Sequence, residues 1–526
     1  MRQPAGRDAR LTAAPVVPPF LAAMILGVLG GCGGGPKLLR SEQQPVIDRR
    51  IVEYPAGTEL KQYITGLTAP TAIAWDNEGS LLIAESGLGG HGPRIVGYKK
   101  DGSFFQIYPR GSQLPFRIAK LVGGEKFRIY GPIGGMVVAN GRIYVSHRDE
   151  HDSGMITAFG YDGTHQTIVA KLPAEGDCSV TDLAVQPGSG RLHFGMGSAT
   201  NSGVAGLDNL RWVRDHRDMH DQPWGELHLL GRRFDTPNPF AGIFGGSDIA
   251  VTGPFQAFGK SKQTTIPGSR MPNAAIYSVD ASGGDLQVEA HGIRYPMGLG
   301  FSETGTLYFT NQGMKLRGTR PVAEDPDVML RLVHGQWYGW PDYTANLLPI
   351  RDKRFQPPER MIINFGYPDL SFLIDHDGSG LTPPNPNSNL VMGEFLPYSG
   401  AAKFDFAPAS GFFSRLRQAG NIAIVAMMGD RAPFDTSGGK VKPDRGYRVV
   451  QVNVDDRSVK DFVRNTFDGP ASSTAAKQGL ERPIDAKFGP DGALYIVDFG
   501  RMDMKKGRER VLGGTGRIYR LVGVGK

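Results

Sequence analysis

Cysteine is scarce in this sequence, which has only Cys32 and Cys178 among its 526 residues. Two cysteines cannot form a disulfide framework, and they exclude a zinc site built on a cysteine cluster. Long apolar heptads and runs of eighteen apolar residues are missing too, and charged residues make up only 21% of the chain. This composition does not suit a helical bundle.

The formal net charge is +7, but no compact run of lysine and arginine and no basic helix accompanies it. We interpret the excess as a slightly basic soluble surface rather than as a nucleic-acid-binding face. Motifs that stack RNA bases or insert a helix into DNA are also absent. The sequence therefore predicts no nucleic-acid partner.

The first residues have the pattern of an export signal. A basic start with Arg2, Arg7 and Arg10 precedes an apolar stretch that ends at Leu29. The segment Leu29-Gly-Gly-Cys32 is similar to the lipobox of bacterial lipoproteins, in which the cysteine is acylated after cleavage. An ordinary cleaved signal is the alternative.

The lipobox predicts a lipoprotein signal peptide over residues 1–31, lipidation at Cys32 and a flexible tether over residues 32–45. The protein is then exported and lipid-anchored to the cell envelope, on the periplasmic or outer-membrane side. It touches the membrane through the lipid alone. With Cys32 acylated, Cys178 has no disulfide partner.

One two-strand pattern recurs six times along the rest of the chain. Each copy has an alternating apolar run, a glycine turn and a second apolar run, which is typical of a β-hairpin. The 73 glycines and 38 prolines agree with many short strands joined by turns. The six copies span Pro70–Glu85, Ile133–Arg148, Val180–Gly197, Pro296–Gly313, Ala401–Gly429 and Pro483–Gly500.

A second short strand follows each copy. Two interleaved series of six predict an all-β fold, a six-bladed β-propeller over residues 46–526, because radial packing of such units leaves only short protected edges. Two stacked sandwiches are the alternative, but they do not require six similar units. The second series starts with Arg94–Tyr98, and its other members begin at Met155, Ala275, Val328, Arg448 and Arg517.

Two long segments interrupt the repeats, at about Thr200–Pro272 and Asp342–Leu396. Loops of this length are usually functional elaborations. We expect both insertions on one face of the propeller, over the central channel. We also expect Val46–Leu67 to add a strand to the last blade and to close the ring.

Five motifs resemble those of the pyrroloquinoline-quinone (PQQ)-dependent sugar dehydrogenases, the glucose/sorbosone dehydrogenase group. The resemblance covers Tyr63 to Leu521 and implies a six-bladed propeller, in agreement with the count of repeats. The motifs are Gly197–Gly203, Gly292–Phe301, Gly335–Asp342, Gly446–Val450 and Leu480–Ile484.

The resemblance also implies a chemistry: PQQ lies over the central channel, Ca²⁺ binds at its quinone edge and a histidine takes the substrate proton. Arg294 matches a cofactor-binding arginine of the family, and Tyr295 stands where the family has an asparagine. Gly313 and Met314 match the two residues whose backbone carbonyls bind Ca²⁺. Arg431 is a candidate second contact to the cofactor.

The family's histidines are replaced in this sequence. Cys178 stands at the position of the catalytic base, and a thiol is a poorer base, since its reference pKa is about 8.5 against about 6.5 for imidazole. Tyr398 stands at the position of a second histidine. His147 and His151, which follow the second repeat, are candidates for a shifted base. A separate group, His216, Asp218, His220 and Asp221, is a candidate metal cluster in the first insertion.

Two functions compete. The first is a PQQ- and Ca²⁺-dependent oxidoreductase that oxidises a small-molecule sugar or related alcohol outside the cytoplasm, with a respiratory electron acceptor. The second is a non-catalytic propeller that binds a glycan or a protein partner. The family resemblance favours the first function, whereas Cys178, Tyr295 and Tyr398 favour the second. Fold alone does not choose between them, because propellers carry many functions.

Overall fold

The computed structural model describes residues 36–39, 43–109, 127–241, 247–361, 370–430, 445–475, 477–505 and 508–524. Within these ranges the chain is nearly all β, and its single α-helix is α2 (Leu210–Asp215). No helix there is both long and apolar enough to cross a bilayer.

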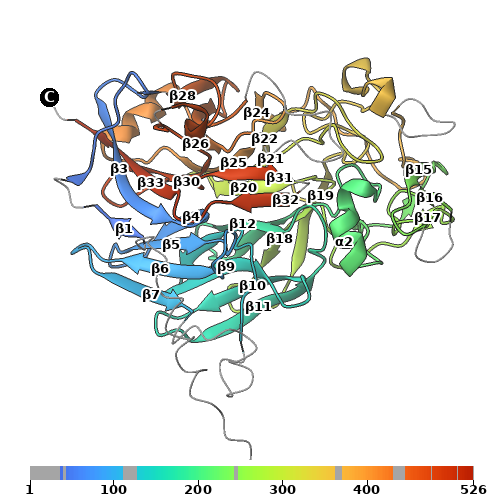
Figure 1. The fold of residues 1–526 in the computed structure, drawn as a ribbon, viewed down its shortest axis with the longest axis horizontal. Coiled ribbons are helices and arrows are strands. Elements are labelled where there is room, and N and C mark those ends of the chain that lie inside the picture. The colour runs from blue at the N-terminus through green and yellow to red at the C-terminus, as the bar shows by residue number, and fades with distance from the viewer. Residues whose placement is uncertain are drawn as a thin grey trace, which may run out of the picture.

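Six sheets arranged around a central channel form a six-bladed propeller, as the repeats predict (Figure 1). Each sheet contributes one innermost strand, and these strands are neighbours around the channel. The innermost strands are β4 (Pro70–Trp75), β8 (Met136–Ala139), β12 (Val180–Val185), β20 (Pro296–Phe301), β25 (Ala401–Phe406) and β29 (Pro483–Phe488).

The two repeat series of the sequence correspond to the first three strands of each blade, so both series are confirmed. The second strands are β5 (Leu81–Glu85), β9 (Arg142–Arg148), β13 (Leu192–Met196), β21 (Leu307–Asn311), β26 (Ile422–Met427) and β30 (Leu494–Asp498). The third strands are β6 (Arg94–Tyr98), β10 (Gly154–Phe159), β18 (Ala275–Val279), β22 (Asp327–Arg331), β27 (Arg448–Asn453) and β33 (Gly516–Gly523).

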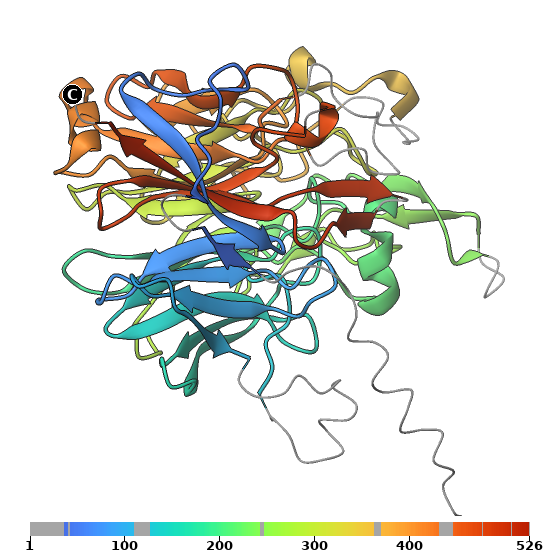
Figure 2. The same cartoon turned by 60° about the vertical axis from the view of Figure 1, so that its left-hand side comes forward.

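The fourth strand of the last blade comes from the start of the chain. Strand β3 pairs antiparallel with β33, from Thr58 opposite Gly523 to Leu67 opposite Gly516, and thereby closes the ring as predicted (Figure 2). Residues 37–38, which fall in the predicted tether, form β1 on the far edge of β3. The fourth strands are β3 (Thr58–Leu67), β7 (Phe104–Tyr108), β11 (His165–Leu172), β19 (Gln287–His291), β24 (Val391–Phe395) and β28 (Val459–Asn465).

The core lies between neighbouring blades, because each sheet packs its two faces on the sheets beside it. All five residues of β5 and all six of β26 are buried. A strand that is covered on both faces reads as a continuous apolar run rather than as an alternation. One core cluster, for example, joins Ala84 and Ile95 of one blade to Ile143 and Val145 of the next.

The first insertion follows β13 and carries secondary structure of its own. It projects from the propeller at the right of Figure 1, where α2 and the strands β15 to β17 are labelled. Its strands pair as two small hairpins, β14 with β17 and β15 with β16. Its elements are η3 (Leu207–Asn209), α2, β14 (Leu227–His228), β15 (Phe234–Pro237), β16 (Ile249–Thr252) and β17 (Thr265–Ile266).

The segment before the second insertion forms strand β23 (Gln336–Trp337), which pairs in parallel with the outer strand β19 of the preceding blade. The second insertion begins after it, at about Asp342, on the outside of that blade. A β-bridge between Leu229 and Ile374 then joins it to the first insertion. The two insertions share one apolar cluster and therefore lie together. They lie at the outer side of the blade that carries β19 and not over the central channel, so the expected placement over the channel is wrong.

The remaining elements are short. Strand β2 (Val52–Glu53) pairs with β28, and β31 (Met502–Lys505) pairs with β32 (Arg508–Val511). The 3₁₀ turns outside the first insertion are η4 (Lys353–Phe355), η5 (Glu359–Met361), η6 (Phe412–Ala419) and η7 (Ala471–Ser473).

Candidate functional site

A polar pocket of about 70 Å³ lies at one mouth of the central channel. Its walls come from segments that directly precede the innermost strands β12, β20 and β25, and from the segments after β21 and β26, so three neighbouring blades surround it. We call it the channel-mouth pocket. It is lined by Asp177, Cys178, Arg294, Tyr295, Gln312, Lys315, Arg317, Tyr398, Gly400, Gly429 and Asp430.

Four residues that the sequence singles out meet in this pocket: Cys178, Arg294, Tyr295 and Tyr398. Cys178 is buried, and its Cβ lies where a side chain on Gly197 would clash, so the two chain segments are in close contact there. The same position of Gly197 also faces the ring of Tyr295. The thiol at the family's base position is therefore packed tightly beside the pocket wall.

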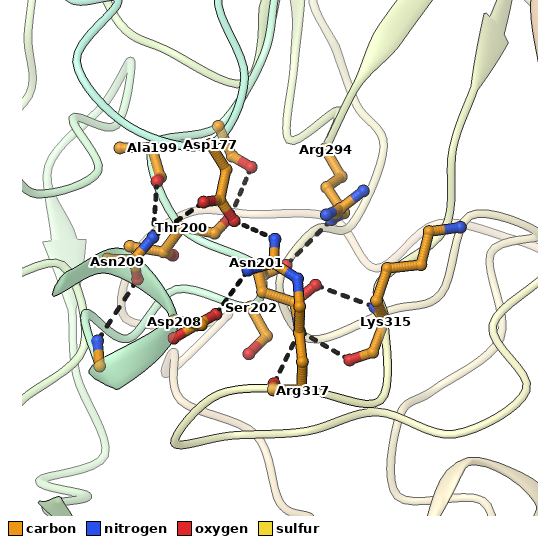
Figure 3. A network of polar contacts seen from close by, with 12 residues as sticks. Asp177, Ala199, Thr200, Asn201, Ser202, Asp208, Asn209, Arg294, Lys315 and Arg317 are labelled. Carbon is orange, nitrogen blue, oxygen red and sulfur yellow. Dashed lines mark hydrogen bonds and ion pairs between the residues drawn. The ribbon is translucent and has the colours of Figure 1, made fainter. Parts of the chain in front are cut away.

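A buried ionic network surrounds Asp177, the chain neighbour of Cys178 (Figure 3). The guanidinium of Arg317 donates to the carboxylates of both Asp177 and Asp208, the latter at 2.8 Å. Burial opposes the charge of Arg317, but the two carboxylates outweigh it and raise the pKa of this arginine. Asn209 adds a hydrogen bond of 3.0 Å to Asp177. The charge of Arg317 is thus neutralised by the protein itself.

Arg294 lies in the same pocket without such a partner. Its side chain is buried, with 5% of the residue exposed, and it donates to the backbone carbonyls of Asn201 at 3.1 Å and Gln312 at 3.4 Å (Figure 3). No carboxylate lies within 4.0 Å of it in the described part of the chain. Among the described residues, the second terminal nitrogen of the guanidinium therefore has no hydrogen-bond partner at the pocket wall.

Lys315 and Tyr398 form the adjoining wall. The Lys315 ammonium lies 3.1 Å from Asp327 and 4.7 Å from the centre of the Tyr398 ring. The Tyr398 hydroxyl accepts the Leu316 N–H at 2.7 Å, and burial raises its pKa to about 12. The phenol is therefore protonated at neutral pH, and no described residue accepts its proton.

Gly313 and Met314 stand between two residues of the pocket wall but do not line the pocket themselves. The Gly313 N–H donates to Asp327 at 3.0 Å, and the Met314 N–H donates to Asp325 at 2.6 Å. Both residues are thus fixed by buried carboxylates. Calcium binding through their carbonyls stays a prediction.

The two histidines considered as shifted bases lie away from the pocket. His147, on β9, is fully buried and hydrogen-bonds to the Arg148 carbonyl at 2.7 Å and to the Thr157 hydroxyl at 2.8 Å. Burial lowers the pKa of His147 to about 4. The side chain of His151 is 79% exposed and lies 3.7 Å from Glu150. Neither histidine is placed to take a proton from a ligand in the channel-mouth pocket.

The candidate metal cluster of the first insertion is dispersed. His216 pairs with Asp152 at 3.1 Å, whereas Asp221 is buried and accepts hydrogen bonds from Ala199 and Asn273. Across the described ranges, no group of three or more His, Cys, Asp or Glu side chains could hold a metal ion. Arg431 and the lipidation candidate Cys32 lie outside the described residues, although Asp430, the neighbour of Arg431, lines the pocket.

Several pocket residues are missing from the sequence-based prediction. Asp177 is the direct neighbour of Cys178, and the alternating pair Lys315 and Arg317 follows Met314, so a local signal existed for each. Nothing local indicates that Arg317 meets Asp177, because 140 positions separate them in the chain.

Fold and site together define a six-bladed propeller with a polar ligand pocket at its channel mouth. No protein-family model matches the sequence, and no curated protein matches it. A carbohydrate-active enzyme of family AA12 from Trichoderma reesei superposes with a TM-score of 0.50 at 15% identity, over 90% of this chain and 98% of that one. The likeness confirms the fold expected from the family resemblance.

Two further solved structures superpose with lower scores. The PQQ domain of pyranose dehydrogenase from Coprinopsis cinerea, in its holo form, gives a TM-score of 0.49 at 14% identity, over 90% of this chain and 98% of that chain. The PQQ-bound aldose sugar dehydrogenase of Streptomyces coelicolor gives 0.45 at 13% identity, over 89% and 99%. At such identities the likeness concerns the fold and not the chemistry.

Proposed function

We propose that the channel-mouth pocket binds the acidic head group of a small molecule, a carboxylate or a phosphate. The observation that carries this proposal is Arg294, a buried guanidinium with no carboxylate partner in the described chain. A buried guanidinium without a carboxylate in direct contact, and with only the more distant Asp208 and Asp325 near it, favours an anionic ligand as its partner. The planar guanidinium suits both kinds of oxyanion.

The surroundings of Arg294 support an oxyanion ligand. The Tyr398 phenol has a proton to donate, and the Lys315 ammonium lies close to its ring. Lys315 already pairs with Asp327, so its ammonium can neutralise only part of the charge of an anionic ligand. The pocket of about 70 Å³ has room for a head group or for a small hydroxy acid.

The residues present do not fit PQQ. The quinone carries three carboxylates on a rigid tricyclic ring, whereas two of the three cations that line the pocket already pair with Asp177, Asp208 and Asp327. Ligand pockets for molecules of that size span roughly 300–1,000 Å³, several times the volume at the channel mouth. The base position holds Cys178. We therefore assign no quinone chemistry to this site.

The geometry thus favours a ligand-binding propeller over a quinoprotein, but the small acidic ligand differs from the glycan or protein partner of the second function expected from sequence. Oxidation of a sugar or alcohol, a respiratory electron acceptor and Ca²⁺ stay predictions that rest on the family resemblance. Export and lipid anchoring at Cys32 are likewise proposals, and they rest on the lipobox pattern.

Calorimetric titration with lactate and with inorganic phosphate tests the proposal, with lactamide as the neutral analogue of lactate. We expect saturable binding of one of the two anions and none of lactamide. Arg294→Gln keeps an amide donor for the Asn201 carbonyl but removes the charge. Since a hydrogen bond to a charged group is worth about 1.5–3 kcal/mol, this variant should bind roughly tenfold to 100-fold more weakly.

Arg50→Gln is the matched control, because it removes the same charge from an exposed arginine that pairs only with Asp48. It should bind like the wild type. Equal affinity of the wild type and Arg294→Gln, or no saturable binding of either anion, would overturn the assignment. Whether lactate or phosphate binds decides the kind of head group.

A further inference from the structure

A second and larger cavity, of about 330 Å³, lies on the outside of the blade that carries β19 and β23. The parallel pairing of these strands sets His291 beside Trp337 and forms one wall. The two insertions, joined by the bridge between Leu229 and Ile374, form the opposite wall. We call this space the insertion cavity. None of its lining residues belongs to the channel-mouth pocket.

Aromatic side chains dominate the walls of the insertion cavity. Trp224, Trp337, Trp340 and Phe255 line it together with His291. Trp224 is 44% exposed, and its ring centre lies 4.9 Å from that of His291. A half-exposed tryptophan that the protein holds against another ring presents a flat apolar face at little entropic loss.

The rest of the lining is polar but almost uncharged. Amide and hydroxyl side chains come from both walls, and the only formally charged residue of the lining is Glu226, whose side chain is 62% exposed and pairs with His228. Burial lowers the pKa of His291 to about 4, so its imidazole is neutral at physiological pH. The cavity therefore has no positive charge that would attract an anion, and its one carboxylate lies largely in solvent.

Hydrogen-bonding capacity remains open inside the cavity. No described residue pairs with the His291 imidazole, and none accepts the indole N–H of Trp224. A neutral imidazole offers one donor and one acceptor, and the indole offers a donor. The cavity thus combines flat apolar faces with uncommitted groups that suit hydroxyls.

We propose that the insertion cavity binds a neutral saccharide of one or two sugar units. The apolar face of a pyranose ring would lie on Trp224, and its hydroxyls would bond to His291 and the neighbouring amides. A volume of about 330 Å³ falls in the range of small-molecule sites, which are mostly apolar with a few placed polar groups. The site requires no anion at Arg294, so it is independent of the channel-mouth pocket.

Titration of the protein with glucose and with cellobiose, followed by tryptophan fluorescence and calorimetry, tests this proposal. We expect saturable binding of at least one of them. Trp224→Ala should weaken it about tenfold, because it removes the stacking face while leaving buried residues in place. Arg294→Gln should leave saccharide affinity unchanged, which separates this site from the proposed anion site.

A second variant, Gly225→Leu, blocks the cavity without removing a wall. A Cβ at Gly225 meets no atom within 4 Å, and the backbone there does not require glycine. This variant should fold normally and lose saccharide binding. Phe104→Ala removes a 51% exposed aromatic from a distant blade edge and is the control, with unchanged affinity expected.

Three results would overturn the proposal. The first is the absence of saturable binding of either sugar. The second is binding that Trp224→Ala and Gly225→Leu leave unchanged. The third is saturable binding of a proline-rich peptide, another ligand of tryptophan-lined grooves, in the absence of sugar binding.

Discussion

Two arginines in one pocket differ in whether the protein supplies their counter-charge. Arg317 has two carboxylates of its own, and Arg294 has only backbone carbonyls. The first arrangement is a structural ion pair, and the second calls for a ligand. The sequence does predict Arg294 as a binding residue. It does not distinguish the two cases, because the partners of Arg317 come from other turns of the ring.

His147 illustrates a second limit at the residue scale. A histidine after a repeat is a reasonable candidate base, but the structure buries it and satisfies both ring nitrogens within its own blade. Burial then lowers the pKa of His147 to about 4, below the ordinary value near 6.5. The sequence pattern does not show whether neighbouring elements cover the face of β9 on which the His147 imidazole lies.

The lowered pKa of His147 predicts a pH dependence of stability. The unfolded chain takes up this proton between about pH 6.5 and pH 4 and the folded protein does not, so acid destabilises the fold. The loss between pH 7 and pH 5 is about 2 kcal/mol from this residue. His147→Asn cannot be protonated and keeps a donor for the Arg148 carbonyl.

Unfolding of wild type and His147→Asn by denaturant at both pH values measures this effect. The destabilisation by the variant should be about 2 kcal/mol smaller at pH 5 than at pH 7. Wild type and variant are compared at the same pH, because burial also raises the pKa of Asp325 to about 7. Protonation of Asp325 stabilises the folded protein in acid and so opposes the effect of His147 on the wild type. A destabilisation that is the same at both pH values would contradict the account.

At the scale of elements, hairpins and the closing strand follow from the sequence, since alternation and turn residues are local. Strand β23 does not. It has only two residues, and it pairs in parallel with β19, which lies in another blade. The repeat pattern does not predict the small hairpins inside the first insertion either. The insertion cavity, built by these elements, therefore emerges only from the structure.

The closing strand β3 gives a prediction at this scale. Ile64 is fully buried in the core between β3, β33 and the first blade. Ile64→Ala should lower the free energy of unfolding by about 2–5 kcal/mol, the range for truncating a buried isoleucine. Lys61→Ala, in the same strand and partly exposed, should change it by less than about 0.5 kcal/mol. Equal stability of the two variants, measured by chemical denaturation, would show that β3 does not hold the ring closed.

In the molecule as a whole, charged side chains on the innermost strands connect separate blades across the channel. Lys403 of β25 is fully buried, donates to the Thr71 carbonyl of β4 at 2.6 Å and lies 3.6 Å from Asp182 of β12. One ammonium thus connects three blades. The innermost strands are thus connected across the channel, while the channel mouth carries a set of side chains unlike the one the family resemblance implies.

This protein has the six-bladed fold that the sugar dehydrogenases share, but its channel mouth does not fit a quinone, and titration with PQQ in the presence of Ca²⁺ is the sharpest test of that conclusion. The absorbance of the cofactor and reduction of an electron-accepting dye with added aldoses are read together. We expect no saturable absorbance change at micromolar PQQ and no dye reduction. A stoichiometric absorbance change with aldose-dependent dye reduction would contradict it.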